Sequence, residues 1–114
     1  MNDSKTQLAK LAVDFWKLAS SFEHHLQNSA EDARLRGQAQ LRFSRRRLEA
    51  ILDESGLTLS CYDGEEFTAS LPVTAINADD IPEHEKYLVE ATIEPTIFAA
   101  EGTVLTGKVT IKGA

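Results

Sequence analysis

Three histidines and one cysteine are the side chains of this sequence best suited to metal binding or nucleophilic chemistry. His24 and His25 are adjacent, and neighbouring helical residues point about 100° apart, so the pair cannot grip one metal ion as an i, i+4 pair can. His84 lies in the acidic stretch 82–85, where we expect a solvated turn residue. Cys61 falls in an expected strand, where we predict a small buried apolar side chain without a nearby base.

Motifs that support catalysis or phosphate binding are missing from the sequence. It contains no glycine-rich phosphate loop, no nucleophile elbow and no paired carboxylates at helical spacing with a cleft signal. One cysteine makes neither an internal disulfide nor a cysteine-only zinc site. We therefore expect no catalytic residue, no metal and no cofactor, and we do not expect an enzyme.

Charge is distributed unevenly along the chain. Residues 1–52 carry nine basic and six acidic side chains, whereas residues 53–114 carry three basic and twelve acidic ones. The acidic half argues against nucleic-acid binding, which needs surplus Lys and Arg. The cluster of Arg42, Arg45, Arg46 and Arg47 could contact phosphates, but a solvated helix face is the favoured interpretation. Arg42 and Arg46 have no evident partner on their helix, so the acidic half or another protein remains possible for them.

The composition is that of an ordinary soluble globular domain. The 114 residues are 42% hydrophobic and 26% charged. No apolar run approaches the roughly 18 residues of a membrane span. The polar N-terminus predicts neither a secretory signal nor an anchor. We therefore expect a cytoplasmic protein that binds neither membrane nor nucleic acid.

The first half of the chain is expected to form two helices. From about Lys5 to Gln27, apolar residues recur in steps of three or four, a nearly heptad stripe that needs a partner helix. The second helix is expected from about Ala30 to Glu54, with Ser29 as its capping residue and Gly56 ending it in a left-handed turn. The small residues near its start permit close approach to a neighbour.

After Gly56 the hydrophobic period changes to two, which predicts strands. We expect strands at Leu57–Tyr62, Leu71–Ile76 and Tyr87–Ile93, and a closing strand from Thr103 to Lys112. The fold class is therefore α+β, with a helical hairpin over residues 1–55 and a small antiparallel β-wing over residues 56–114.

One hairpin cannot bury both its apolar stripe and the flank that carries Val13 and Trp16. Pairing two hairpins side by side into a four-helix bundle would cover the stripe, so we predict a homodimer. The predicted dimer interface comprises Leu11, Phe15, Leu18, Phe22, Leu41 and Leu48.

This order of elements resembles the head of GrpE, the nucleotide exchange factor of DnaK-type chaperones. The likeness covers about residues 8 to 112. The segment 15–26 occupies the place of the family's first bundle helix, and Gly37 falls where its second bundle helix usually has a glycine. Residues 48–59 look like the family's helix exit. In the wing, residues 76–82 and 102–111 are similar to the acidic, proline-containing segment and to the closing strand.

Several wing residues depart from the family pattern. Phe67 is retained, but residues 68–74 replace the family's Asp-Pro and His-x-Ala. Thr96-Ile97 stands in place of a Gly-Tyr or Gly-Phe pair, and Leu105 and Gly102 replace two arginines. The long N-terminal stalk of the family has no counterpart, since only seven residues precede Leu8. Either the chain is a short divergent relative, or it is one domain of a longer protein.

The resemblance implies a mechanical function in the stress response and in protein folding. An exchange factor binds the nucleotide-free state of the chaperone ATPase more tightly than the ADP-bound state, which opens the nucleotide cleft. The resemblance assigns partner contacts on the wing to Glu94, Pro95, Thr96, Phe98 and Leu105. An acidic wing would meet a basic patch on the chaperone and accelerate encounter. The alternative is a dimeric interaction module that keeps this scaffold without exchange activity.

Overall fold

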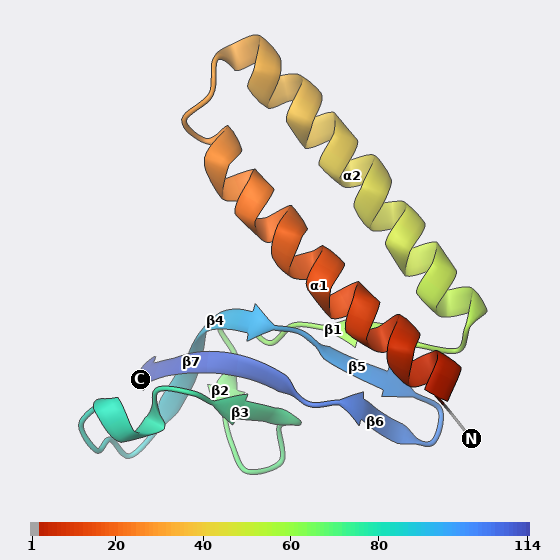
Figure 1. Cartoon of the computed structure of the whole chain (residues 1–114). Helices are drawn as coiled ribbons and strands as arrows, with labels where there is room; N and C mark the ends of the chain where they lie inside the picture. The colour runs from red at the N-terminus through yellow and green to blue at the C-terminus, as the bar shows by residue number, and fades with distance from the viewer. Residues whose placement is uncertain (1–2) are drawn as a thin grey trace. The chain divides into compact units, whose positions relative to one another are not determined.

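A computed structural model describes residues 3–114 and divides the chain into two compact units, Met1–Leu57 and Thr58–Ala114. The first unit is a helical hairpin, and the second consists of strands with one short 3-10 helix (Figure 1). The predicted α+β class is confirmed. The division falls close to the expected boundary between residues 55 and 56.

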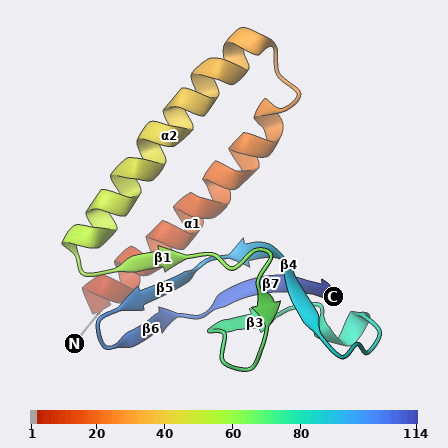
Figure 2. The same ribbon diagram turned by 180° about the vertical axis from the view of Figure 1, so that it is seen from behind.

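The hairpin consists of α1 (Asp3–Leu26) and α2 (Glu31–Glu54), each 24 residues long. The two helices lie side by side and run in opposite directions (Figures 1 and 2). The prediction that Ser29 caps α2 is wrong, because Ala30 occupies that position without a side-chain cap, and the Ser29 hydroxyl donates instead to the His25 carbonyl at 3.4 Å. Gly56 ends the hairpin with φ +74°, the left-handed conformation predicted for it.

The helices of the hairpin are held together by a small apolar core and by one ion pair. Ala19, Leu26 and Leu41 form a buried cluster against which Phe15 packs. A Cβ on Gly37 would lie 2.5 Å from Leu26 Cδ2, so the glycine lets the Leu26 side chain approach α2 closely. Arg45 pairs with Glu23 of α1 at 3.3 Å rather than with Glu49 on its own helix.

The second unit, called the β unit below, contains two sheets. The three-stranded sheet has the order β1-β5-β6, and the four-stranded sheet has the order β2-β4-β7-β3. The strands are β1 (Thr58–Ser60), β2 (Glu66–Phe67), β3 (Val73–Ala75), β4 (Tyr87–Glu94), β5 (Thr96–Ala99), β6 (Gly102–Leu105) and β7 (Gly107–Gly113). A short 3-10 helix, η1 (Ala78–Asp80), follows β3.

The structure corrects the expectation of one small antiparallel sheet. The predicted closing strand is two strands, β6 and β7, which belong to different sheets. Leu105 lies in the three-stranded sheet, whereas Val109 and Ile111 lie in the four-stranded sheet, so the three side chains do not share one sheet face. β3 pairs with β7 in parallel, and the sequence patterns predicted neither β2 nor β5. The short, interrupted pairings explain these differences, because strands of two to four residues have too few positions to display an alternating pattern.

The core of the four-stranded sheet lies on one face of β4 and β7. Val89, Val109 and Ile111 are buried there, and partly buried side chains from β2, β3, β4 and the loops pack against them. The Asn77 amide fastens the loop after β3 to β7, since its Nδ2 donates to the Ile111 carbonyl and its Oδ1 accepts from the Ile111 N–H, both at 2.9 Å.

Thr96 joins three backbone segments of the β unit through one hydroxyl group. Its side chain is fully buried, its Oγ1 donates to the Pro72 carbonyl at 2.9 Å, and the Gly107 N–H donates to it at 3.1 Å.

A Thr96→Val substitution keeps the shape of the side chain but leaves the Pro72 carbonyl and the Gly107 N–H without this hydrogen-bond partner. We expect a loss of about 1–3 kcal/mol in the free energy of unfolding of the β unit, measured by urea unfolding. Thr103→Val, at an exposed position, is the matched control and should change stability by less than about 0.5 kcal/mol. Equal effects of the two substitutions would contradict this role for Thr96.

Candidate functional site

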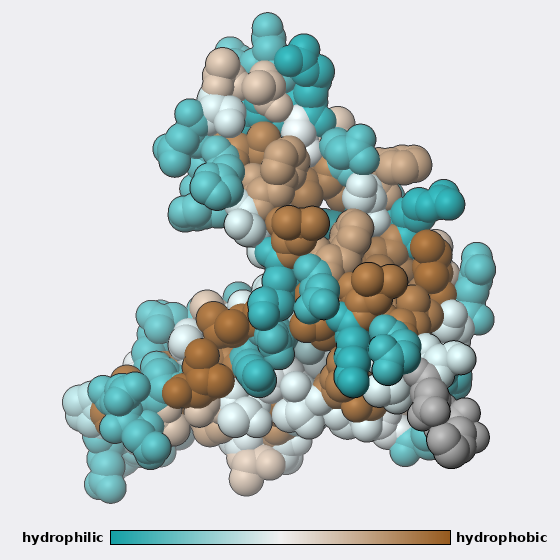
Figure 3. Space-filling model, viewed as in Figure 1, coloured by the Kyte–Doolittle hydropathy of each residue, from teal (hydrophilic) through white to brown (hydrophobic). Residues whose placement is uncertain are grey.

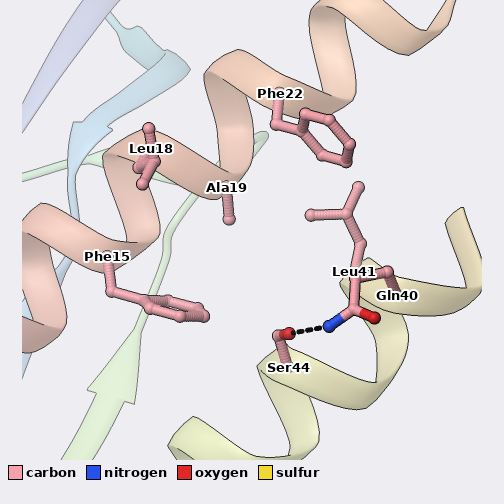
Figure 4. A pocket seen from close by; sticks show the side chains of 7 residues that line it. All are labelled: Phe15, Leu18, Ala19, Phe22, Gln40, Leu41 and Ser44. Carbon is pink, nitrogen blue, oxygen red and sulfur yellow. Dashed lines mark hydrogen bonds between the residues drawn. The ribbon is translucent and has the colours of Figure 1, made fainter. Parts of the chain in front are cut away.

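An apolar groove lies between α1 and α2 of the hairpin. It consists of two adjoining hollows of about 270 and 260 Å³, which share Phe15 and Ser44. Figure 4 shows the first hollow, where Phe15, Ala19 and Phe22 of α1 point toward α2. In Figure 3, apolar side chains gather along the hairpin between its two helices. The groove follows the length of the hairpin, and we call it the hairpin groove.

Both walls of the hairpin groove repeat with heptad spacing. The α1 wall advances in steps of three and four through Leu8, Leu11, Phe15, Leu18 and Phe22, and the α2 wall through Leu41, Ser44, Leu48 and Ile51. Two facing stripes of this period form the seam into which side chains of a partner helix insert in four-helix bundles.

Large apolar side chains of the hairpin groove are exposed to solvent. Leu18 is 72% exposed, Leu11 64% and Phe22 43%. Monomeric proteins in water rarely display contiguous apolar patches, because covering them with a partner releases ordered water. The groove can therefore bind apolar surface.

Each of the six residues predicted for a dimer interface lines the hairpin groove. Leu11, Phe15, Leu18 and Phe22 come from α1, and Leu41 and Leu48 come from α2. Leu41 is buried within the hairpin core, so its remaining surface is small. The prediction omitted Leu8, Ser44 and Ile51, although the same periodicity contains them.

The rim of the hairpin groove contains a few polar groups. Gln40 Nε2 donates to Ser44 Oγ at 3.0 Å, which satisfies the hydroxyl in the middle of the apolar surface. Arg47 lines the second hollow, where its long aliphatic stem can cover apolar surface while the guanidinium stays in water. Every other side chain that lines the two hollows is apolar.

The five wing residues predicted to contact a partner do not form one surface. Pro95 and Thr96 are buried and present no contact area. The pairing of β5 with β6 sets Leu105 opposite Ile97, the neighbour of Phe98, so Phe98 and Leu105 lie on opposite faces of the three-stranded sheet. Glu94 belongs to β4 and forms an ion pair with Lys108 at 3.6 Å.

The histidines and the cysteine do not gather into a site. Within residues 3–114, no cluster of three or more His, Cys, Asp or Glu side chains could hold a metal ion. His24 and His25 are exposed on α1, and the His84 ring stacks edge-on against Tyr87 with ring centroids 5.8 Å apart. The prediction that Cys61 is buried is wrong, because it is an exposed residue beyond the end of β1.

The environment of Cys61 makes its thiol less acidic than an ordinary one. Partial burial of the sulfur and then the Asp63 carboxylate raise the pKa of Cys61, against a lowering contribution from a hydrogen bond with Thr92. Only the thiolate reacts with iodoacetamide. Alkylation should therefore be slow near neutral pH and accelerate at higher pH than for a free cysteine.

An Asp63→Asn substitution should accelerate alkylation of Cys61 by about threefold near pH 8, because removing the carboxylate charge lowers the pKa of the thiol. Mass spectrometry of iodoacetamide adducts across pH measures this rate. Glu65→Gln is the control, and equal acceleration by both substitutions would contradict the assignment to Asp63.

Neither α1 nor α2 is long and apolar enough to cross a membrane. Comparisons of the chain with protein-family models, with curated proteins and with solved structures find no match.

Proposed function

We propose that this protein is a homodimeric co-chaperone of the GrpE type, which binds a DnaK-type ATPase through its β unit and accelerates release of ADP. The observation that supports the proposal most directly is the hairpin groove. Its lining includes all six residues that the heptad pattern assigned to a dimer interface. The order of elements, a helical hairpin followed by a β unit, agrees with the resemblance.

The geometry of the groove supports the proposed dimer. In a twofold-symmetric pair, the groove of one hairpin packs against the same groove of its partner, so each exposed leucine finds an apolar neighbour. Burying Leu11, Leu18 and Phe22 contributes roughly 1.5–3 kcal/mol for each side chain fully removed from water. The four helices would then form one bundle with a shared core.

Nucleotide exchange needs no catalytic group, only a difference in affinity. A partner that binds the open ATPase more tightly than the closed, ADP-bound form shifts the population toward the open state. The β unit has ten acidic and three basic side chains between residues 58 and 114, which would accelerate its encounter with a basic surface. Phe98, Leu105 and Glu94 retain exposed area for such a contact.

The proposal is tested with a DnaK-type chaperone loaded with fluorescent ADP, whose release is followed after mixing with this protein. We expect at least about tenfold faster release at micromolar concentration, with an effect that weakens as salt screens the acidic β unit. Charge reversal of exposed acidic residues, Glu90→Lys with Glu101→Lys, should slow the association. Unchanged release over the whole concentration range would overturn exchange activity.

A second candidate is a dimeric interaction module without exchange activity. The burial of Pro95 and Thr96 favours it, together with the separation of Phe98 from Leu105 on opposite sheet faces. This candidate predicts a stable dimer that leaves ADP release unchanged. Sedimentation and the release assay together therefore distinguish the two functions.

A further inference from the structure

The helix α2 carries an excess of positive charge, most of it at positions that do not line the groove. Residues 33–48 contain six arginines and no acidic residue. Within the described part of the chain, only Arg45 of these six forms an ion pair, with Glu23. Among the other five, Arg34 is partly buried and Arg47 lines the groove, whereas Arg36, Arg42 and Arg46 are exposed away from it.

Two of these arginines share one side of α2 with exposed apolar residues. Positions on a helix separated by three or four residues lie on the same side, and this spacing joins one set of exposed residues in the middle of α2. We call this set the arginine face: Leu35, Ala39, Arg42, Phe43 and Arg46.

The arginine face is exposed and does not belong to the hairpin groove. Phe43 is 62% exposed and Leu35 54%, and neither lines the two hollows of the groove. Arg42 and Arg46 are exposed as well. Because the face and the groove use different residues, pairing through the groove would leave the face open.

We propose that the arginine face binds an acidic amphipathic segment of a partner protein, with Asp or Glu side chains beside apolar ones at helical spacing. Arginine pairs with carboxylates through two parallel hydrogen bonds, which suits Arg42 and Arg46 one turn apart. Phe43 and Leu35 supply apolar contacts on either side of Ala39, whose small side chain permits close approach. The face extends over about 17 Å of helix, enough for roughly three turns of a partner helix.

The charge and apolar content of the chain favour a peptide over a nucleic acid. The whole chain has a net charge of −6, which disfavours a long polyanion more than a short peptide with a few carboxylates. Phosphate contacts would also leave Phe43 and Leu35 without apolar neighbours. A peptide that combines carboxylates with leucines satisfies both kinds of side chain on the face.

The test uses the full chain and a labelled synthetic peptide of about 16 residues with leucines and glutamates at helical spacing, followed by fluorescence anisotropy. We expect binding in the micromolar range that weakens at least about fivefold when salt rises from about 50 to about 300 mM. The peptide with glutamines in place of glutamates should bind at least about tenfold more weakly.

Two variants locate the binding site. The double substitution Arg42→Glu with Arg46→Glu should weaken peptide binding by at least about tenfold, and Phe43→Ala by about fivefold. The matched control, Lys10→Glu with Lys112→Glu, makes the same charge change at exposed positions elsewhere and should bind within about twofold of the original chain. Circular dichroism confirms that each variant is folded.

The outcomes distinguish this site from the groove and from the proposed function. The arginine-face variants should keep the sedimentation behaviour and the ADP-release activity of the original chain, so loss of peptide binding alone supports the proposal. Equal loss in the lysine control, or equal binding of the glutamine peptide, would overturn it. Tighter binding of a single-stranded oligonucleotide or of anionic lipid vesicles than of the acidic peptide would also overturn it.

Discussion

Leu18→Glu should convert the proposed dimer to a monomer. Leu18 is the most exposed large apolar side chain of the hairpin groove, at 72%, so the substitution removes little packing within one hairpin. In the symmetric dimer both copies would place a carboxylate in the apolar seam. Since a buried unpaired charge costs several kcal/mol, we expect the dissociation constant to rise by roughly three orders of magnitude. Sedimentation equilibrium should report twice the 12.6 kDa chain mass for the original protein and the single mass for the variant.

The control for this experiment is Leu35→Glu, which makes the same chemical change on α2 outside the hairpin groove. Leu35 is 54% exposed, and we expect its variant to remain dimeric. An original chain that sediments as a folded monomer would refute the dimer. Dissociation by both substitutions would show instead that the groove has no special role.

Gly107→Ala should strongly destabilise the β unit. A Cβ at this position would lie 2.5 Å from Thr96 Oγ1, 2.8 Å from the Glu94 carbonyl oxygen and 3.0 Å from the Thr96 nitrogen. Two of these atoms belong to the backbone between β4 and β5, which cannot move away without breaking strand pairs. We expect a loss of about 2–4 kcal/mol and a fall of roughly 10–20 °C in the melting temperature.

Thermal unfolding of the β unit can be followed by the near-ultraviolet circular dichroism of Tyr62 and Tyr87, the only two tyrosines of the chain. Gly64→Ala serves as the control, because Gly64 has φ +84° but no atom within 4 Å of an added Cβ. It should cost only about 1 kcal/mol of backbone strain. If the two alanine substitutions were equally harmful, close packing at Gly107 would not be the cause.

The effects expected for Leu18→Glu and Gly107→Ala have different physical causes, one in the hairpin and one in the β unit. In the hairpin, exposed apolar side chains favour association, so a charge in the groove should oppose it. In the β unit, two small sheets are connected at Gly107 and Thr96, where backbone segments approach too closely for a side chain. Association through the hairpin would remain possible when the β unit is weakened, so the two substitutions should act independently.

Helix prediction succeeded because the hairpin is described by local rules. Steps of three and four residues, together with Gly56, located α1 and α2 to within about two residues. The same steps selected the lining of the groove, since residues on one helical stripe share a direction whatever they meet. The prediction that Ser29 caps α2 failed because a serine next to a helix end can also donate its hydroxyl to a carbonyl of the preceding helix. Here the Ser29 hydroxyl donates to the His25 carbonyl.

Strand prediction was less successful because sheet pairing joins residues distant in the sequence. The alternation predicted a strand at Tyr87–Ile93, which is β4 (Tyr87–Glu94), but β2 and β5 are too short to show such a pattern. Thr96 is buried where its hydroxyl bonds to Pro72 and Gly107, which are distant in the sequence, so no local pattern could predict its burial. The burial of Cys61 was predicted wrongly for the same reason, because neighbouring loops decide whether a side chain at a strand end is buried.

The amino-acid order alone determined the two helices, their apolar stripe, the arginine run on α2 and the acidic character of the second half, since each depends only on residue type and short spacing. Tertiary structure decided that the stripe forms a groove with two walls, that the last expected strand is divided between two sheets, and that Phe98 and Leu105 lie on opposite faces. The physical reason is that helical geometry is set within one turn of chain, whereas sheet membership and burial depend on segments brought together from a distance.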